Sequence, residues 1–162
     1  MRKALLFLLC ISFISCGYVA HSTLPKGVKI AVPVFKNSTY KEGVEVKVGK
    51  EVIKKFINEG TEVVGSPDNA DFLLSGTLIA YEKKPLRWVK GIEEEIEEYR
   101  LILTAHITYK DLRTNEVLLD TQVSGDTDYF IRGNKAKDEE SAVEEAAQDL
   151  AKNIVDAICE QW

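Results

Sequence analysis

The sequence predicts an α+β two-layer sandwich, with two helices packed on one face of a mostly antiparallel sheet of four to five strands. Three segments in the middle of the chain alternate apolar and polar residues with a period of two, which is typical of strands with one buried and one polar face. Two other segments carry apolar stripes at helical spacing. Each element must bury its apolar face, so we expect helices and sheet to stack around one core.

The first 15 residues have the features of a secretory signal peptide. Two basic residues precede an apolar stretch that is too short to span a membrane. The segment Phe13–Cys16 (Phe-Ile-Ser-Cys) resembles a bacterial lipobox, whose cysteine is lipidated and begins the mature protein. The alternative is an ordinary signal peptide cut a few residues later. We expect lipidation at Cys16, a tether over residues 16–27 and one domain over residues 28–162.

The lipid defines the expected location. Several acyl chains together make membrane attachment effectively permanent. Gly17 stands where an Asp usually signals retention in the inner membrane of Gram-negative bacteria, so we expect the protein at the periplasmic face of the outer membrane.

Cys10 leaves with the signal peptide and Cys16 is acylated. Cys159 is then the one remaining thiol, and no intramolecular disulfide is expected.

The mature chain is acidic and long enough for one core. Removing 15 residues from 162 leaves 147, which suits a single domain. The signal peptide takes two basic residues, leaving 19 against 26 acidic ones and a net charge of about −7. An acidic domain is a poor general binder of nucleic acid, so no nucleic-acid partner is expected.

The first strand is predicted over residues 28–35. Pro33 cannot donate to a ladder, which predicts that this strand lies at a sheet edge or contains a bulge. In this strand Val28, Ile30, Val32 and Val34 are expected to face the same way.

The next segment is ambiguous between strand and helix. Residues 44–48 alternate like a strand, but Val48, Val52 and Phe56 keep helical spacing, which favours a helix over about 45–58. A short strand is predicted over residues 61–64, ended by the turn residues 66–69.

Three long strands are predicted around residues 72–80, 99–109 and 117–123. The apolar side of the first carries Phe72, Leu74, Leu78 and Ala80, with Gly76 at a close approach. The corresponding side of the second carries Tyr99, Leu101, Leu103, Ala105, Ile107 and Tyr109, and that of the third carries Val117, Leu119, Thr121 and Val123. The C-terminal segment 139–161 has the strongest helical stripe, with Asp138 as its N-cap.

Short motifs along this chain resemble, in their order, the LptE family of lipopolysaccharide-assembly lipoproteins. They are the cysteine with Gly17-Tyr18, IAVPVF before Asn37-Ser38-Thr39-Tyr40, Ala70-Asp71, Ser75-Gly76-Thr77, Glu98-Tyr99-Arg100-Leu101 and Tyr109-Lys110-Asp111. The resemblance implies a two-layer α/β fold and an outer-membrane partner, the large β-barrel translocon LptD. It also implies that the protein plugs this barrel, helps it to fold and binds lipopolysaccharide.

No catalytic or metal site is expected. The two histidines, His21 and His106, have no cysteine or carboxylate near them at metal-ligand spacing. The sequence also lacks a Gly-rich phosphate loop and a nucleophile elbow. We therefore expect a non-enzymatic protein without a cofactor.

Two basic segments could bind the phosphates of a glycolipid, since Lys and Arg are the natural partners of phosphate. In the first, Trp88 accompanies the basic residues, and the alternative is a solvated hairpin tip neutralised by nearby glutamates. The second could simply link a strand to the last helix. The candidate residues are Lys83, Lys84, Arg87, Lys90, Arg132 and Lys135.

The polar face of the predicted sheet is the candidate surface for the barrel. Alternating polar side chains on long strands suit the polar interior of a barrel, although the same face could simply contact solvent. The candidates are Arg100, Thr104, His106, Thr108 and Gln122. The alternative function is that of a scaffold or secretion component in another envelope complex.

Overall fold

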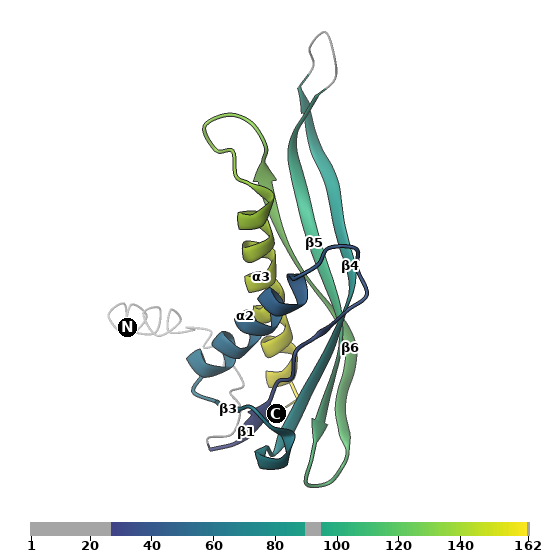
Figure 1. The fold of residues 1–162 in the computed structure, drawn as a ribbon, viewed down its shortest axis with the longest axis vertical. Coiled ribbons are helices and arrows are strands. Elements are labelled where there is room, and N and C mark those ends of the chain that lie inside the picture. The colour runs from purple at the N-terminus through teal and green to yellow at the C-terminus, as the bar shows by residue number, and fades with distance from the viewer. Residues whose placement is uncertain (1–26, 90–94, 162) are drawn as a thin grey trace, which may run out of the picture.

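A mixed six-stranded sheet forms one layer and two helices form the other (Figure 1). The computed structural model describes residues 27–89 and 95–161. The helices are α2 (Val44–Asn58) and α3 (Glu139–Cys159), and a 3-10 helix, η2, covers Pro67–Asn69. The strands are β1 (Lys29–Ala31), β2 (Lys36–Asn37), β3 (Glu62–Val64), β4 (Phe72–Val89), β5 (Glu95–Asp111) and β6 (Val117–Phe130). The predicted two-layer α+β sandwich is confirmed, with six strands in place of four to five.

The strands follow the order β3-β1-β4-β5-β6, and β2 also pairs with β4. The long strands β4, β5 and β6 are antiparallel neighbours, as predicted. The short strands differ, because β1 runs parallel to both β3 and β4, and β2 runs parallel to β4. The signal peptide, the lipidation site Cys16 and most of the tether lie outside the described residues.

The predicted continuous strand over residues 28–35 is wrong. The chain forms β1, leaves the sheet around Pro33 and returns as β2. Val34 is 74% exposed, whereas its neighbour Phe35 is buried. The reason is Gly76 on β4, where an added Cβ would lie 2.3 Å from the Phe35 ring. The missing side chain leaves room for that ring, so Phe35 takes the core position. Of the two alternatives predicted from Pro33, the sheet edge is wrong, because β1 lies between β3 and β4, whereas the ladder is interrupted around this proline.

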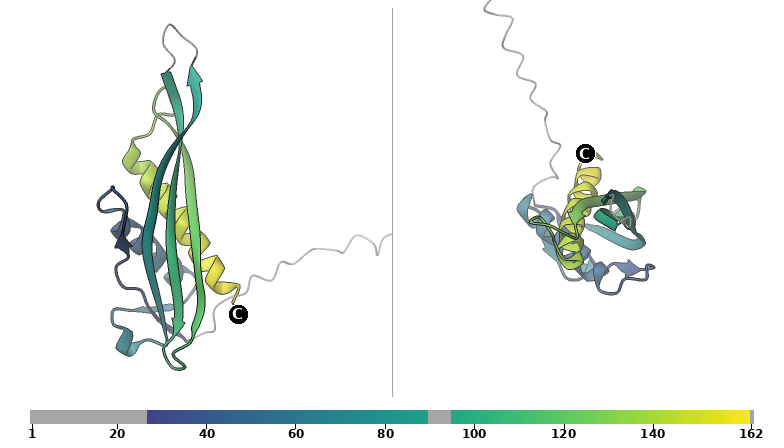
Figure 2. Two further views of the ribbon diagram at one scale, coloured as in Figure 1. Left: turned by 90° about the vertical axis from the view of Figure 1, so that its right-hand side faces the viewer. Right: turned by 90° about the horizontal axis from the view of Figure 1, so that it is seen from above.

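Helix α2 resolves the ambiguity at residues 44–48. Val44, Val48, Val52 and Phe56 are all buried, and this interval of four residues is helical. Helix α3 starts at its predicted N-cap, where the backbone N–H of Ser141 donates to Asp138 Oδ1 at 2.7 Å. Both helices cover the same side of the sheet (Figure 2). Cys159 is partly buried against the core at the end of α3.

The core face of the sheet carries the apolar residues predicted for β5. The side chains of Leu101, Leu103, Ala105, Ile107 and Tyr109 are fully buried. On β6 the contact with the helix layer is closest at Gly125, because an added Cβ there would lie 2.1 Å from the backbone nitrogen of Leu150. Helix α3 therefore packs directly on the backbone of β6.

Strand β4 departs from prediction in two ways. A register shift between Leu78 and Ala80 adds one residue, so Tyr81 and not Ala80 is buried on the core face. The strands predicted around 72–80 and 99–109 are also too short, because β4 continues to Val89 and β5 begins at Glu95. Backbone pairing between β4 and β5 continues as far as Val89, so the charged side chains of this segment do not end the strand. The paired strands β4 and β5 extend past the start of α3 (Figure 1).

Strand β6 is also longer than predicted and ends at Phe130. Its outer edge lies along α3, whose side chains supply hydrogen bonds where no further strand pairs. The N–H of Asp126 donates to Asp149 Oδ2 at 3.0 Å, and Asn153 Nδ2 donates to the Ser124 carbonyl at 2.9 Å. These contacts protect an edge that could otherwise pair with another chain.

Among the described helices, none is long and apolar enough to cross a membrane.

Candidate functional site

The surface of β4, β5 and β6 that points away from the helices is the main candidate, and we call it the outer sheet face. Its residues on β5 alternate with buried ones, and on β6 from Asp120 to Asp128 exposed residues alternate with less exposed ones. Figure 2 shows the three strands in front of the helix layer with nothing packed on this side. The face is therefore both polar and uncovered in the described part of the chain.

The centre of the outer sheet face is a set of cross-strand polar pairs between β5 and β6. Thr104 lies opposite Ser124, and their hydroxyl oxygens are 2.9 Å apart. His106 Nε2 is 2.7 Å from Asp120 Oδ1, and the Thr108 hydroxyl donates to Asp120 Oδ2 at 3.4 Å. These side chains bind one another, which fixes the positions of the hydrogen-bonding groups on this surface.

Arg100 forms the strongest pair of this face. Its guanidinium donates to both carboxylate oxygens of Asp128, at 2.7 and 2.8 Å, and lies 3.4 Å from Asp126. The bidentate hydrogen bond lowers the pKa of Asp128 and raises that of Arg100. The pair is exposed, so it orients the two side chains more than it stabilises the fold.

The five predicted barrel-facing residues thus share one surface. Arg100, Thr104, His106 and Thr108 lie along β5, and Gln122 lies on β6 directly opposite His106. The sequence places Asp120 on the same polar face but does not indicate that it contacts His106, or that Asp128 binds Arg100. Only the register of β5 against β6 places these carboxylates beside the histidine and the arginine.

The predicted phosphate-binding residues do not form one cluster. Lys83 points to the helix side and donates to Glu139 Oε2 at 2.8 Å, whereas Lys84 is 3.0 Å from Glu82. Arg87 is 3.5 Å from Glu98, and its guanidinium lies 5.7 Å from the centre of the Phe130 ring. Arg132 and Lys135 are exposed in the loop between β6 and α3. Lys90 lies outside the described residues.

A polar cluster that the sequence pattern does not indicate surrounds Glu139, the first residue of α3. The Tyr81 hydroxyl and Lys41 Nζ donate to Glu139 Oε1 at 2.7 and 3.1 Å, while Lys83 binds Oε2. These contacts, led by the one from Lys83, lower the pKa of Glu139 to about 2. Burial and the carboxylate raise the pKa of Tyr81, so its hydroxyl remains a donor. Lys41 and Glu139 are 98 positions apart, and no local pattern indicates their contact.

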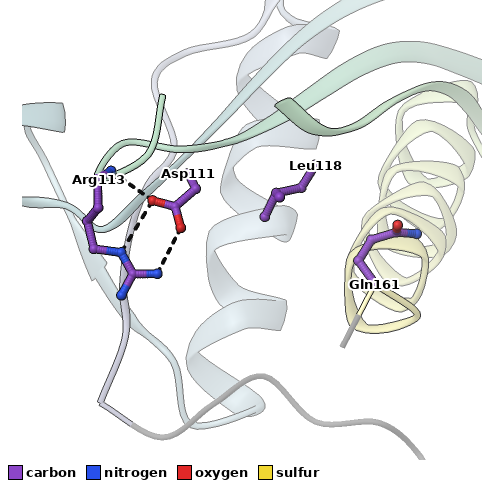
Figure 3. A pocket seen from close by; sticks show the side chains of 4 residues that line it. All are labelled: Asp111, Arg113, Leu118 and Gln161. Carbon is purple, nitrogen blue, oxygen red and sulfur yellow. Dashed lines mark hydrogen bonds and ion pairs between the residues drawn. The ribbon is translucent and has the colours of Figure 1, made fainter. Parts of the chain in front are cut away.

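A pocket of about 320 Å³ lies at the opposite end of the domain (Figure 3). It is lined by Asp111, Arg113, Leu118 and Gln161. The guanidinium of Arg113 and two backbone N–H groups bind Asp111, which lowers the pKa of that carboxyl to about 2. The charged groups of the pocket thus stabilise the turn between β5 and β6.

Among residues 27–89 and 95–161, no three His, Cys, Asp or Glu side chains are grouped to hold a metal ion.

Comparison with solved structures finds the same fold in several bacterial proteins. Rare lipoprotein B from Shewanella oneidensis has a TM-score of 0.54 and 18% identity, covering 82% of this chain and 94% of that chain. PelC from Paraburkholderia phytofirmans, a dodecamer, has a TM-score of 0.53 and 18% identity, with 83% and 91% covered. The hypothetical protein CT253 from Chlamydia trachomatis has a TM-score of 0.58 and 10% identity, with 85% and 98% covered. At these identities the likeness concerns the fold alone.

No curated protein sequence matches this chain. The family model described as LptE, lipopolysaccharide-assembly, matches residues 28–158, which is nearly all of the described domain. This match agrees with the resemblance seen in the motifs and supports, at a coarse level, a role in lipopolysaccharide assembly. The chain belongs to the LptE family of lipopolysaccharide-assembly proteins.

Proposed function

We propose that this protein is a non-enzymatic, lipid-anchored component of the outer membrane that plugs an LptD-like β-barrel and helps to assemble it. In this role it takes part in the delivery of lipopolysaccharide to the cell surface. The observation that carries the proposal is the outer sheet face, which is long, polar and free of helices. The interior of a membrane barrel is itself polar, so the two surfaces suit each other chemically.

The interface must be broad to hold the two proteins together. Because Thr104, His106 and Arg100 already have partners on β6, each gains little when it exchanges a water contact for one with the barrel. Affinity then comes from many satisfied contacts over an area above the standard of about 1,600 Å².

The test is co-purification of the barrel from solubilised outer membranes. Changing Thr104→Glu together with His106→Glu would place unpaired charge in the closed interface, and we expect loss of the barrel while the domain stays folded. The matched control changes Val46→Glu and Ile57→Glu, which are 59% and 57% exposed on α2. Retention of the barrel by the first variant would contradict docking through the outer sheet face. Recovery of another complex without a barrel would favour the scaffold or secretion role.

The anchor has its own test. Cys16→Ser should abolish fatty-acid labelling and release the chain from the membrane unless a partner retains it. Continued acylation of this variant would contradict the lipobox interpretation. For lipopolysaccharide, the exposed Lys84, Arg87, Arg132 and Lys135 are the proposed contacts, together with Lys83 and Lys90.

A further inference from the structure

The Glu139 cluster carries more positive charge than its carboxylate neutralises. Two ammonium groups, from Lys41 and Lys83, meet one carboxylate, at 3.1 and 2.8 Å. In the part of the chain that the structure describes, neither lysine lies within 4.0 Å of a second carboxylate. Neighbouring lysines are different, because Lys47 and Lys137 have acidic partners of their own. One positive charge is therefore left over at this place.

The cluster is open to small solutes. The side chains of Lys41, Lys83 and Glu139 are 36%, 35% and 33% exposed. Beside them the ring of Tyr40, which is 73% exposed, packs edge-on against Tyr81 with centroids 5.3 Å apart. An exposed aromatic ring next to paired cations suits a sugar that bears a phosphate, because the ring can pack on the sugar while the lysines bind the phosphate.

We propose that Lys41, Tyr81 and Lys83 form a binding site for the phosphate of a phosphorylated sugar, and that Glu139 occupies this site in the ligand-free protein. A phosphate monoester carries a charge of about −1.5 to −2 at neutral pH, which matches the two ammonium groups. The Tyr81 hydroxyl supplies a third donor. The phosphate site itself does not depend on the proposed function. Its assignment to a glycolipid rests on that function.

The Glu139 side chain can leave the cluster while α3 keeps its cap. It is the first residue of α3, and the cap of that helix is made by Asp138 and Ser141. Rotation of its side chain toward solvent breaks only the contacts with the two lysines and Tyr81. Because the carboxylate is tethered next to the site, it competes with a ligand at a high effective concentration. Free phosphate should therefore bind the natural protein weakly.

The test measures binding of inorganic phosphate to the detergent-solubilised full chain by calorimetric titration. Glu139→Gln keeps the shape and a polar contact but removes the competing charge, and we expect affinity to rise about tenfold. Glu140→Gln, the same change one position later, should leave affinity unchanged because Glu140 is paired with Lys47. Adding Lys83→Met or Lys41→Met to Glu139→Gln should remove the gain. Equal affinity of the Glu139→Gln and Glu140→Gln proteins would overturn the site.

A second arm identifies the source of the phosphate. Vesicles that contain a phosphorylated glycolipid are compared with vesicles that contain its dephosphorylated form. Tighter binding of Glu139→Gln to the phosphorylated form alone supports the glycolipid headgroup. A gain for inorganic phosphate without any preference between the vesicles overturns the glycolipid assignment. Failure of the barrel to co-purify would contradict the proposed function and leave the phosphate titration unaffected, so the two failures can be told apart.

Discussion

The substitution Gly125→Ala adds a single methyl group, yet we expect it to destabilise the domain strongly. A Cβ at this position would lie 2.1 Å from the nitrogen, 2.4 Å from Cα and 2.7 Å from Cβ of Leu150. The first two atoms are helix backbone and cannot rotate away, so α3 must move by about an ångström. Its buried stripe would then lose contact with the sheet. Overpacking of this kind costs about 1–3 kcal/mol, and a clash with backbone favours the upper end.

The assay is urea denaturation of Gly125→Ala beside a control with the same change. Gly49 is a buried position within α2, and a Cβ there meets nothing within 4 Å. Gly49→Ala should therefore stabilise the protein by about 0.5–1 kcal/mol, because Gly is a poor helix former. The two substitutions should change the free energy of unfolding in opposite directions. A Gly125→Ala protein as stable as the natural one would refute the close contact between β6 and α3.

Further substitutions test the two faces, the helix and one carboxyl group. Leu103→Ala should cost about 2–5 kcal/mol in urea denaturation, whereas Thr104→Ala, its neighbour on the outer sheet face, should cost less than about 1 kcal/mol. Ile154→Asp should prevent folding, seen as loss of a cooperative transition, because it buries an unpaired charge. Asp138→Ala should cost about 0.5–2 kcal/mol through loss of the N-cap. The Glu139 carboxyl has a folded pKa of about 2 against an ordinary 4.5, so it stabilises the fold above pH 4.5 and this stabilisation is lost as the pH falls toward 2. The Glu139→Gln protein should lose less stability than the natural one in acid unfolding over that range.

The sequence predicts the elements whose pattern is long and regular. Strand β5 shows five consecutive buried positions at a spacing of two, and α3 shows its stripe and its cap. These elements could be predicted because each obeys a single period along its length. The predictions failed where a contact between residues distant in sequence determines which side chain is buried. Phe35 leaves the pattern of its own strand because Gly76, 41 positions later, leaves room for its ring.

The candidate sites divide in the same way. The outer sheet face could be predicted, since its residues alternate with the core of one strand. The acidic partners of Arg100 and His106 could not, because Asp128 lies beyond the predicted end of β6 and the contact of Asp120 with His106 depends on the register of β5 against β6. The grouping of basic residues by proximity in sequence also failed. Consecutive residues of a strand point to opposite faces, so Lys83 meets α3 while Lys84 meets Glu82.

This division of the basic residues bears on how a phosphorylated ligand and a barrel could be bound at the same time. Lys83 and the Glu139 cluster lie on the helix side of β4, whereas Lys84 and Arg100 lie on the outer sheet face. A barrel that covers the outer sheet face would bury Lys84 and Arg100 and leave the cluster on the other side of the sheet. Binding at one surface then does not exclude binding at the other. The long ladder of β4 with β5 connects them, because opposite faces of the same strands carry the two surfaces.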